Sequence, residues 1–230
     1  MSNRILIVED EKSIAEFIEV YLKNEDFEVY KCVSAEEVLK IMDTKEFDLV
    51  LLDIMLPGKD GFFLCKKIRE EYQYPIIMLT AQNDEVSKIN GLTLGADDYI
   101  TKPFLPLEMV ARVKAQLRRY KKYGRIDDEG NSGILSYSGL ELNIKTRECS
   151  LNGNQLNLTP SEYDILRLLL EHKGEVVASE QLFKTIWGDE YYNKNNTISV
   201  HVRNLRGKLG DNAANPKYIK TVWGVGYKIV

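Results

Sequence analysis

Short apolar runs alternate with stretches of helical hydrophobic periodicity over the first 120 residues. The runs predict strands at residues 5–8, 27–33, 49–52, 76–79 and 99–100. The periodic stretches predict helices at residues 13–24, 34–43, 62–71, 85–93 and 107–120. Five strands that alternate with five helices indicate a doubly wound α/β domain at residues 1–120, in which helices cover both faces of a parallel sheet.

A different pattern follows a polar, glycine-containing stretch at residues 121–133, which predicts an interdomain linker. Short apolar runs are separated by Gly139 and by Asn152-Gly153, a dipeptide typical of hairpin turns. Helices are expected at residues 160–172, 179–187 and 196–209, and β runs at 218–222 and 227–230. A small antiparallel sheet, three helices and a terminal hairpin indicate an α+β winged helix-turn-helix domain at residues 134–230.

Composition agrees with two cytoplasmic domains. The chain has 230 residues, of which 44% are hydrophobic and 29% charged, and no apolar stretch approaches the length of a membrane span. Acidic residues follow the first apolar run, where a signal peptide needs an uninterrupted apolar core. We therefore expect no membrane insertion. Cys32, Cys65 and Cys149 are odd in number and widely spaced, which favours reduced structural thiols over disulfides or zinc ligands.

Charge is distributed unevenly along the chain. Residues 1–120 hold 16 Lys and Arg against 22 Asp and Glu, a net charge of −6, whereas residues 134–230 hold 12 against 10, a net charge of +2. Residues 196–230 carry six basic residues and a single acid, Asp211. A basic end on an acidic chain suggests a polyanionic partner, although a solvated charged surface is the alternative.

Polar residues that end successive predicted strands form the first candidate site. They are Glu9, Asp10, Asp53, Thr80 and Lys102. In a parallel sheet the carboxyl ends of the strands share one crevice, so these side chains should converge. Three clustered carboxylates need a cation, and oxygen ligands suit Mg²⁺. An aspartate such as Asp53 can form an acyl phosphate if a metal and an ammonium group, here Lys102, neutralise the phosphoryl charge.

Other interpretations of this region are weaker. A single strand-ending aspartate is commonly a turn residue, and Glu9-Asp10 could cap the following helix, but five such residues together are harder to explain in that way. No Gly-x-Gly-x-x-Gly follows the first strand, and no Gly-x-x-x-x-Gly-Lys occurs. Asp53 is followed by Ile54-Met55, with no second aspartate two residues on. Dinucleotide-binding, nucleotide-triphosphate-binding and aspartate-based phosphatase functions therefore lack their phosphate-handling groups.

Residues 1–120 resemble the flavodoxin-like receiver domain of two-component response regulators. The resemblance lies in Val8-Glu9-Asp10, Leu52-Asp53-Ile54-Met55-Leu56-Pro57-Gly58, Leu79-Thr80-Ala81 and Lys102-Pro103-Phe104. It implies that a histidine kinase phosphorylates Asp53, and that Glu9, Asp10, Asp53 and the Met55 carbonyl bind Mg²⁺. It also implies that Lys102 pairs with the phosphoryl group, that Thr80 hydrogen-bonds it and that Tyr99 turns inward, with an ordinary core aromatic as the alternative for Tyr99. The Lys102-Pro103 peptide is expected to be cis.

The stretch from Leu94 to Phe104 is similar in particular to OmpR/PhoB-type regulators. In that family the fourth helix, fifth strand and fifth helix form a symmetric dimer face on phosphorylation. The matching positions here are Lys88, Asp97, Asp98, Glu108, Arg112, Lys114 and Arg119. Lys88 could pair with Glu108 and Asp98 with Arg112, which would select a partner more than add stability. Unpaired surface charge is the alternative.

The helix expected at residues 196–209 carries an apolar stripe of Ile198, Val202, Leu205 and Leu209, which must face the core. The opposite side presents Asn196, Val200, Arg203, Asn204 and Gly207, flanked by Thr197 and Lys208. Arginine can read guanine, asparagine adenine, and valine a thymine methyl in the major groove. Asn204 is the preferred candidate for a base contact, with a phosphate contact as the alternative.

Residues 134–230 resemble the OmpR/PhoB winged-helix domain. The matching motifs are Leu158-Thr159-Pro160-Ser161-Glu162-Tyr163, Ser199-Val200-His201-Val202-Arg203-Asn204-Leu205-Arg206 and Thr221-Val222-Trp223-Gly224-Val225-Gly226-Tyr227. The resemblance implies that a head-to-tail dimer of the protein binds promoter DNA with direct repeats. It also implies RNA polymerase as a partner. Some relatives have a wing arginine for the minor groove where this chain has Trp223, which we expect to pack against the hairpin.

Together these features predict a transcription factor that is switched by phosphorylation of Asp53 and by the dimerisation that follows. The only reactions that we expect it to catalyse are its own phosphorylation and dephosphorylation. A magnesium-dependent phosphohydrolase is one alternative, but it does not explain residues 134–230. A constitutive DNA-binding protein with an inert first domain is another, and the intact acidic set opposes it. Residues 74–80 and 107–123 resemble regulators of vancomycin-type glycopeptide resistance.

Overall fold

A computed structural model describes residues 2–58, 60–81, 85–122, 133–188 and 196–230. The chain divides into two compact units, Met1–Leu117 and Arg118–Val230. Most of the predicted linker lies outside the described residues, and its first two residues belong to a helix instead. Within the described ranges no helix is both long enough and apolar enough to cross a lipid bilayer.

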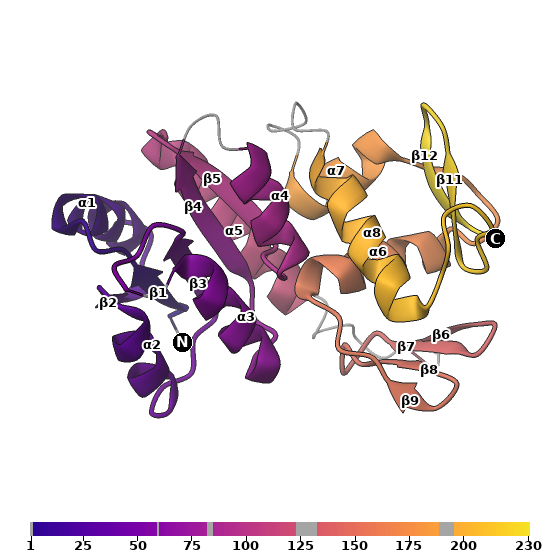
Figure 1. The fold of residues 1–230 in the computed structure, drawn as a ribbon, viewed down its shortest axis with the longest axis horizontal. Coiled ribbons are helices and arrows are strands. Elements are labelled where there is room, and N and C mark those ends of the chain that lie inside the picture. The colour runs from indigo at the N-terminus through magenta and orange to yellow at the C-terminus, as the bar shows by residue number, and fades with distance from the viewer. Residues whose placement is uncertain (1, 59, 82–84, 123–132, 189–195) are drawn as a thin grey trace. The chain divides into compact units, whose positions relative to one another are not determined.

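The N-terminal unit contains a five-stranded parallel sheet with the strand order β2-β1-β3-β4-β5 (Figure 1). Its strands are β1 (Arg4–Val8), β2 (Glu28–Cys32), β3 (Leu49–Asp53), β4 (Ile76–Ala81) and β5 (Asp98–Lys102). Its helices are α1 (Lys12–Lys23), α2 (Ala35–Met42), α3 (Gly61–Glu71), α4 (Glu85–Thr93) and α5 (Pro106–Lys122). The predicted doubly wound fold with five strands and five helices is confirmed.

Continuous apolar sequence places the central strands in the core. All five residues of β3 are buried, as are four of the five in β1, because helices shield both faces of the sheet. Ile5, Ile7, Leu49 and Leu51 are completely buried in one cluster with apolar residues of α1 and α5. Each such side chain contributes about 1.5–3 kcal/mol on burial. This rigid centre positions Asp53, the last residue of β3.

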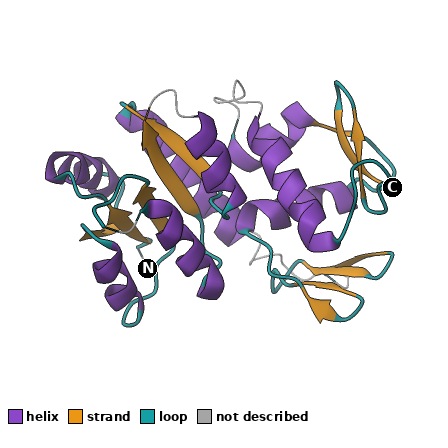
Figure 2. Cartoon of the chain, in the orientation of Figure 1, coloured by secondary structure: helices purple, strands orange, loops and turns teal. Residues whose placement is uncertain are grey.

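In the residues that the structure describes, the C-terminal unit combines two small antiparallel sheets with three helices. Figure 2 shows the helices and strands in different colours. The first sheet has the order β6-β7-β8-β9, with β6 (Ile134–Tyr137), β7 (Leu140–Asn143), β8 (Cys149–Leu151) and β9 (Asn154–Gln155). The helices are α6 (Pro160–Glu171), α7 (Ser179–Trp187) and α8 (Asn196–Leu209). The second sheet contains β10 (Val177–Ala178), β12 (Gly226–Ile229) and β11 (Ile219–Val222), in that order. The predicted winged-helix architecture is confirmed.

Local signals set the start of α6. The Thr159 side chain accepts a hydrogen bond from the backbone N–H of Glu162, and the Glu162 carboxylate accepts one from the backbone N–H of Thr159. This reciprocal arrangement satisfies two N–H groups that a helix start leaves without partners. Glu162 also accepts a hydrogen bond from Lys208 Nζ at 2.6 Å, so the start of α6 is tied to the end of α8.

Candidate functional site

The carboxylates predicted to meet at the end of the sheet do so. Carboxylate oxygens of Glu9, Asp10 and Asp53 all lie within 4.8 Å of one another. Glu9 and Asp53 are buried, whereas Asp10 is exposed. Glu9 and Asp10 directly follow β1 and Asp53 ends β3, and β1 and β3 are neighbours in the sheet. The convergence therefore follows from the sheet topology.

Lys102 joins this group from the end of β5. Its Nζ lies 2.6 Å from Glu9 Oε2 and 2.8 Å from Asp53 Oδ2. Burial alone would lower the pKa of Lys102, but its hydrogen bonds to Asp53 and Glu9 raise that pKa. The ammonium group therefore stays charged beside the carboxylate of Asp53, where it can neutralise negative charge on an attached group.

The Glu9 carboxylate has a raised pKa in this cluster. Burial raises the pKa of Glu9 to about 7, the hydrogen bond from Lys102 opposes that shift, and the charge of Asp53 adds to it. Burial without enough cationic partners thus leaves Glu9 partly protonated near neutral pH. Oxygen ligands in this number and arrangement fit a hard divalent cation such as Mg²⁺.

We expect Mg²⁺ to raise the melting temperature of the N-terminal unit more at pH 8 than at pH 6. The pKa of Glu9 is higher in the folded protein than in the unfolded chain. Deprotonation of Glu9 therefore lowers the free energy of unfolding as the pH rises from about 4.5 to about 7. At pH 8 a cation binds an ionised carboxylate without displacing a proton. Thermal unfolding followed by circular dichroism, with Glu9→Gln as control, measures the difference. Equal shifts at both pH values in the wild type would contradict it.

The other residues predicted around Asp53 lie on β4 and β5. Asp53 pairs in register with Leu79, next to Thr80, and Thr80 Oγ1 is buried with no hydrogen-bond partner among the residues described. A buried hydroxyl in this position can donate to a phosphoryl oxygen. Tyr99 is also buried, and Lys88 Nζ lies 5.4 Å from the centre of its ring. The Lys102-Pro103 peptide is cis, as expected.

Several predicted dimer-face residues form ion pairs within the chain. Arg112 pairs with Asp98 at 2.7 Å and with Glu108 at 3.1 Å. Lys114 pairs with Glu25 at 2.5 Å. Arg119 stands on the last turn of α5, a turn that belongs to the C-terminal unit, and its Nε lies 2.7 Å from Asp164 Oδ2. Of the two pairings expected from the sequence, Asp98 with Arg112 therefore occurs inside one copy of the chain.

Five of the predicted dimer-face residues differ from the expected surface position, because Lys88, Asp97, Asp98, Arg112 and Arg119 are all buried. Asp97 departs furthest from that expectation. Its side chain is fully buried, and Asp97 Oδ2 accepts hydrogen bonds from Arg69 at 2.6 Å and from the backbone N–H of Ile76 at 3.0 Å. Arg69 also donates to the carbonyls of Gly95 and Tyr74. Asp97 thus ties α3 to the start of β4, because a buried carboxylate must be compensated by donors. Arg69 was not predicted from the sequence.

The C-terminal candidate surface lies on α8. Arg203 is exposed and Asn204 is half-buried, as expected for the side opposite the apolar stripe, whose four residues are all buried. Thr197 and Val200 are only 2% and 5% exposed, which differs from their expected place on the free face. Lys208 donates to Glu162 and to the carbonyl of Asn157. The side chain of Asn196 lies outside the described residues.

Trp223 corrects another expectation. It was expected to pack against the hairpin, but it is 90% exposed at the turn between β11 and β12. Gly224, the next residue, has a φ of +73° and sharpens this turn. The base of the hairpin is held by Arg206 of α8, which donates to the Ile219 carbonyl and to Thr221 Oγ1. The anchoring role of Arg206 was missed, because the sequence does not show which residues face a helix across space.

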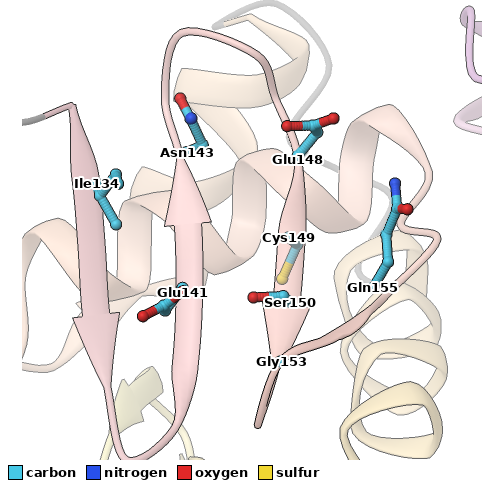
Figure 3. A pocket seen from close by; sticks show the side chains of 8 residues that line it. All are labelled: Ile134, Glu141, Asn143, Glu148, Cys149, Ser150, Gly153 and Gln155. Atoms are coloured by element: carbon cyan, nitrogen blue, oxygen red, sulfur yellow. The ribbon is translucent and has the colours of Figure 1, made fainter.

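A pocket of about 300 Å³ lies over the first sheet of the C-terminal unit (Figure 3). Glu141 and Ser150 are cross-strand partners on β7 and β8, and Glu148 and Gln155 also line the pocket. The thiol of Cys149 is a poor nucleophile here because burial raises its pKa to about 11. Cys149 is therefore not an activated nucleophile in this pocket.

Comparisons with known proteins agree with the two-unit architecture. Residues 5–114 match the family described as response regulator receiver domain, and residues 153–229 match the family described as transcriptional regulatory protein, C terminal. Regulatory protein VanR of Enterococcus faecium is 60% identical over 230 residues, covering 100% of this chain and 99% of that protein. Regulatory protein VanRc of Enterococcus gallinarum is 46% identical over 229 residues, with 100% and 99% covered. The crystal structure of DrrB, a Thermotoga maritima OmpR/PhoB homologue, has a TM-score of 0.54 at 32% identity, and the match covers both chains completely.

Proposed function

Because this chain belongs to the OmpR/PhoB-type response regulators, we propose that it is a transcription factor switched by phosphorylation of Asp53. The observation that carries the proposal is the contact of Asp53 Oδ2 with Lys102 Nζ beside two further carboxylates. A carboxylate nucleophile next to a charged ammonium group and a cation-binding cluster is the arrangement that acyl phosphate formation requires.

The proposed reaction is transfer of a phosphoryl group from a phosphohistidine of a sensor kinase to Asp53. An Asp53 carboxylate oxygen attacks phosphorus, the O–P bond forms and the histidine N–P bond breaks. Glu9, Asp10, Asp53 and the carbonyl of Met55 would hold Mg²⁺, which supplies charge neutralisation at the phosphoryl oxygens. Lys102 would balance the negative charge of the phosphoryl group, and the hydroxyl of Thr80 would donate a hydrogen bond to a phosphoryl oxygen.

The signal then passes to DNA through dimerisation. A hydrogen bond from Thr80 to the phosphoryl group and an inward Tyr99 would alter the face that carries Lys88, Asp98, Glu108 and Arg112. Two copies joined there would bring two C-terminal units to neighbouring half-sites, and avidity would raise their affinity for direct repeats. In each copy α8 enters the major groove, with Arg203 and Asn204 as the base or phosphate contacts.

The relatives support a proposal for the physiological role. Regulatory proteins VanR and VanRc match the chain from end to end, so we propose that it works in the cytoplasm with a histidine kinase and RNA polymerase. The promoters of glycopeptide-resistance genes are its proposed targets. Hydrolysis of the acyl phosphate would return the protein to its resting state.

The proposal is tested by binding to a genomic DNA fragment library with and without acetyl phosphate and Mg²⁺. We expect the phosphodonor to concentrate binding on repeated half-sites, and both EDTA and Asp53→Ala to remove that gain. Binding that ignores the phosphodonor and the substitution would indicate a constitutive DNA-binding protein. Continuous release of inorganic phosphate without any change in DNA binding would indicate a phosphohydrolase.

A second variant tests the DNA surface on the recovered site. Arg203→Ala should weaken binding by about 1–3 kcal/mol, roughly 5- to 150-fold, because the exposed guanidinium contacts a base edge or a phosphate. Lys184→Ala on α7 is the matched control, since that lysine forms an exposed ion pair with Glu180. Both affinities are measured by fluorescence anisotropy at one salt concentration. Equal affinities of Arg203→Ala and the wild type would remove Arg203 from the interface.

A further inference from the structure

Gly61, the first residue of α3, makes a very close approach to the phosphoacceptor strand. A Cβ atom built on Gly61 would lie 2.2 Å from the carbonyl oxygen of Asp53, 2.8 Å from Ile54 Cα and 3.0 Å from the carbonyl carbon of Asp53. Ordinary contacts between non-bonded heavy atoms are about 3.5–4.0 Å. All three neighbours are backbone atoms, which cannot rotate away, so any side chain at this position must move the strand end or the helix.

The same glycine closes the connection between β3 and α3. Its N–H donates to the carbonyl of Ile54 at 2.9 Å. Between these residues lies Met55, whose backbone N–H donates to Asp53 Oδ1 at 3.2 Å. Gly61 therefore determines the position of the Asp53 backbone and of the segment that orients its carboxylate. The φ angle of Gly61 lies outside the left-handed region, so another residue could adopt this backbone conformation. Glycine is needed here because it has no Cβ atom.

We infer that Gly61 is a positioning residue for phosphoryl transfer to Asp53, an inference that rests on the proposed function. A methyl group at Gly61 displaces the main chain that holds the Asp53 carboxylate and so changes the position of that carboxylate relative to Lys102. Reactive groups tolerate little displacement, because a shift of about 1 Å can cost roughly 100-fold in rate. The variant should keep its fold and react slowly.

The test compares Gly61→Ala with two matched controls. Gly91→Ala adds the same methyl group to another helix of this unit, where the new Cβ would lie 2.4 Å from the sulfur of Met78, an atom of a flexible side chain and not of the backbone. Asp60→Ala removes the hydrogen bond from Phe63 N–H that caps α3, which weakens the same helix start without adding an atom near Asp53. Gly91→Ala shows the effect of an added methyl group, and Asp60→Ala shows the effect of a weakened start of α3. A further loss of rate in Gly61→Ala is then due to displacement of Asp53.

The measurement is the rate of phosphorylation by acetyl phosphate at saturating Mg²⁺, divided by the folded fraction from circular dichroism. We expect Gly61→Ala to be about 10- to 100-fold slower than the wild type, and both controls to stay within about twofold. If Gly61→Ala is unfolded, trimethylamine N-oxide, which favours compact states, is added to every sample. A rate per folded molecule equal to that of Asp60→Ala would overturn the inference. A wild type that is never phosphorylated at Asp53 would instead refute the proposed function.

Discussion

Lys102→Ala should slow phosphorylation of Asp53 by acetyl phosphate by roughly 10²- to 10³-fold. Lys102 Nζ lies 2.8 Å from Asp53 Oδ2, so in the wild type a positive charge already stands where the phosphoryl oxygens add negative charge. In the variant, solvent would have to reorganise to supply that stabilisation. The rate is measured at saturating Mg²⁺ and at pH 8, where Glu9 is ionised in the wild type.

The same substitution should strengthen Mg²⁺ binding at pH 8. Removing the ammonium group takes away a charge that repels the cation and a donor that occupies oxygens of Glu9 and Asp53. General damage to the fold would not slow phosphorylation and at the same time raise the affinity for Mg²⁺. Lys67→Ala, which removes an exposed ion pair with Glu70, should change neither quantity. Weaker Mg²⁺ binding by Lys102→Ala would contradict this account of the site.

Leu169→Ala should destabilise the C-terminal unit by about 2–5 kcal/mol. Leu169 is completely buried in the cluster in which α6 packs against α8, and its truncation leaves a cavity in a close-packed core. The free energy of unfolding of a domain is only about 5–15 kcal/mol, so the loss is large. The position of α8 depends on this core. DNA affinity should fall near the new melting temperature and recover on cooling.

Tryptophan fluorescence reports on this unit alone, because Trp187 and Trp223 are the two tryptophans of the chain and both belong to it. Trp187 is 2% exposed and Trp223 is 90% exposed, so a red shift on urea unfolding comes from Trp187. Val176→Ala, at a position that is 41% exposed, is the matched control and should shift the midpoint little. If both variants unfold at the wild-type midpoint, Leu169 does not contribute as its burial implies.

Sequence reasoning succeeded where the signal was local or followed from topology. Periodicity predicted every strand of the N-terminal sheet, because side-chain alternation and helical repeats are properties of neighbouring residues. The convergence of Glu9, Asp53 and Lys102 also followed, since the ends of parallel strands meet at one edge. In the C-terminal unit β10 escaped prediction, because Val177 and Ala178 form a strand too short to show a pattern.

Tertiary structure decided what depends on partners distant in the sequence. Asp97 turned inward because Arg69 and the Ile76 N–H supply donors there, and Trp223 stayed exposed because a tight turn projects it from the hairpin. The need for a glycine at position 61 came from the carbonyl of Asp53. The amino-acid sequence by itself determined the two folds and the chemistry of the acidic site. Packing determined which side chains remain available for partners, because burial and hydrogen bonding are settled only when distant segments meet.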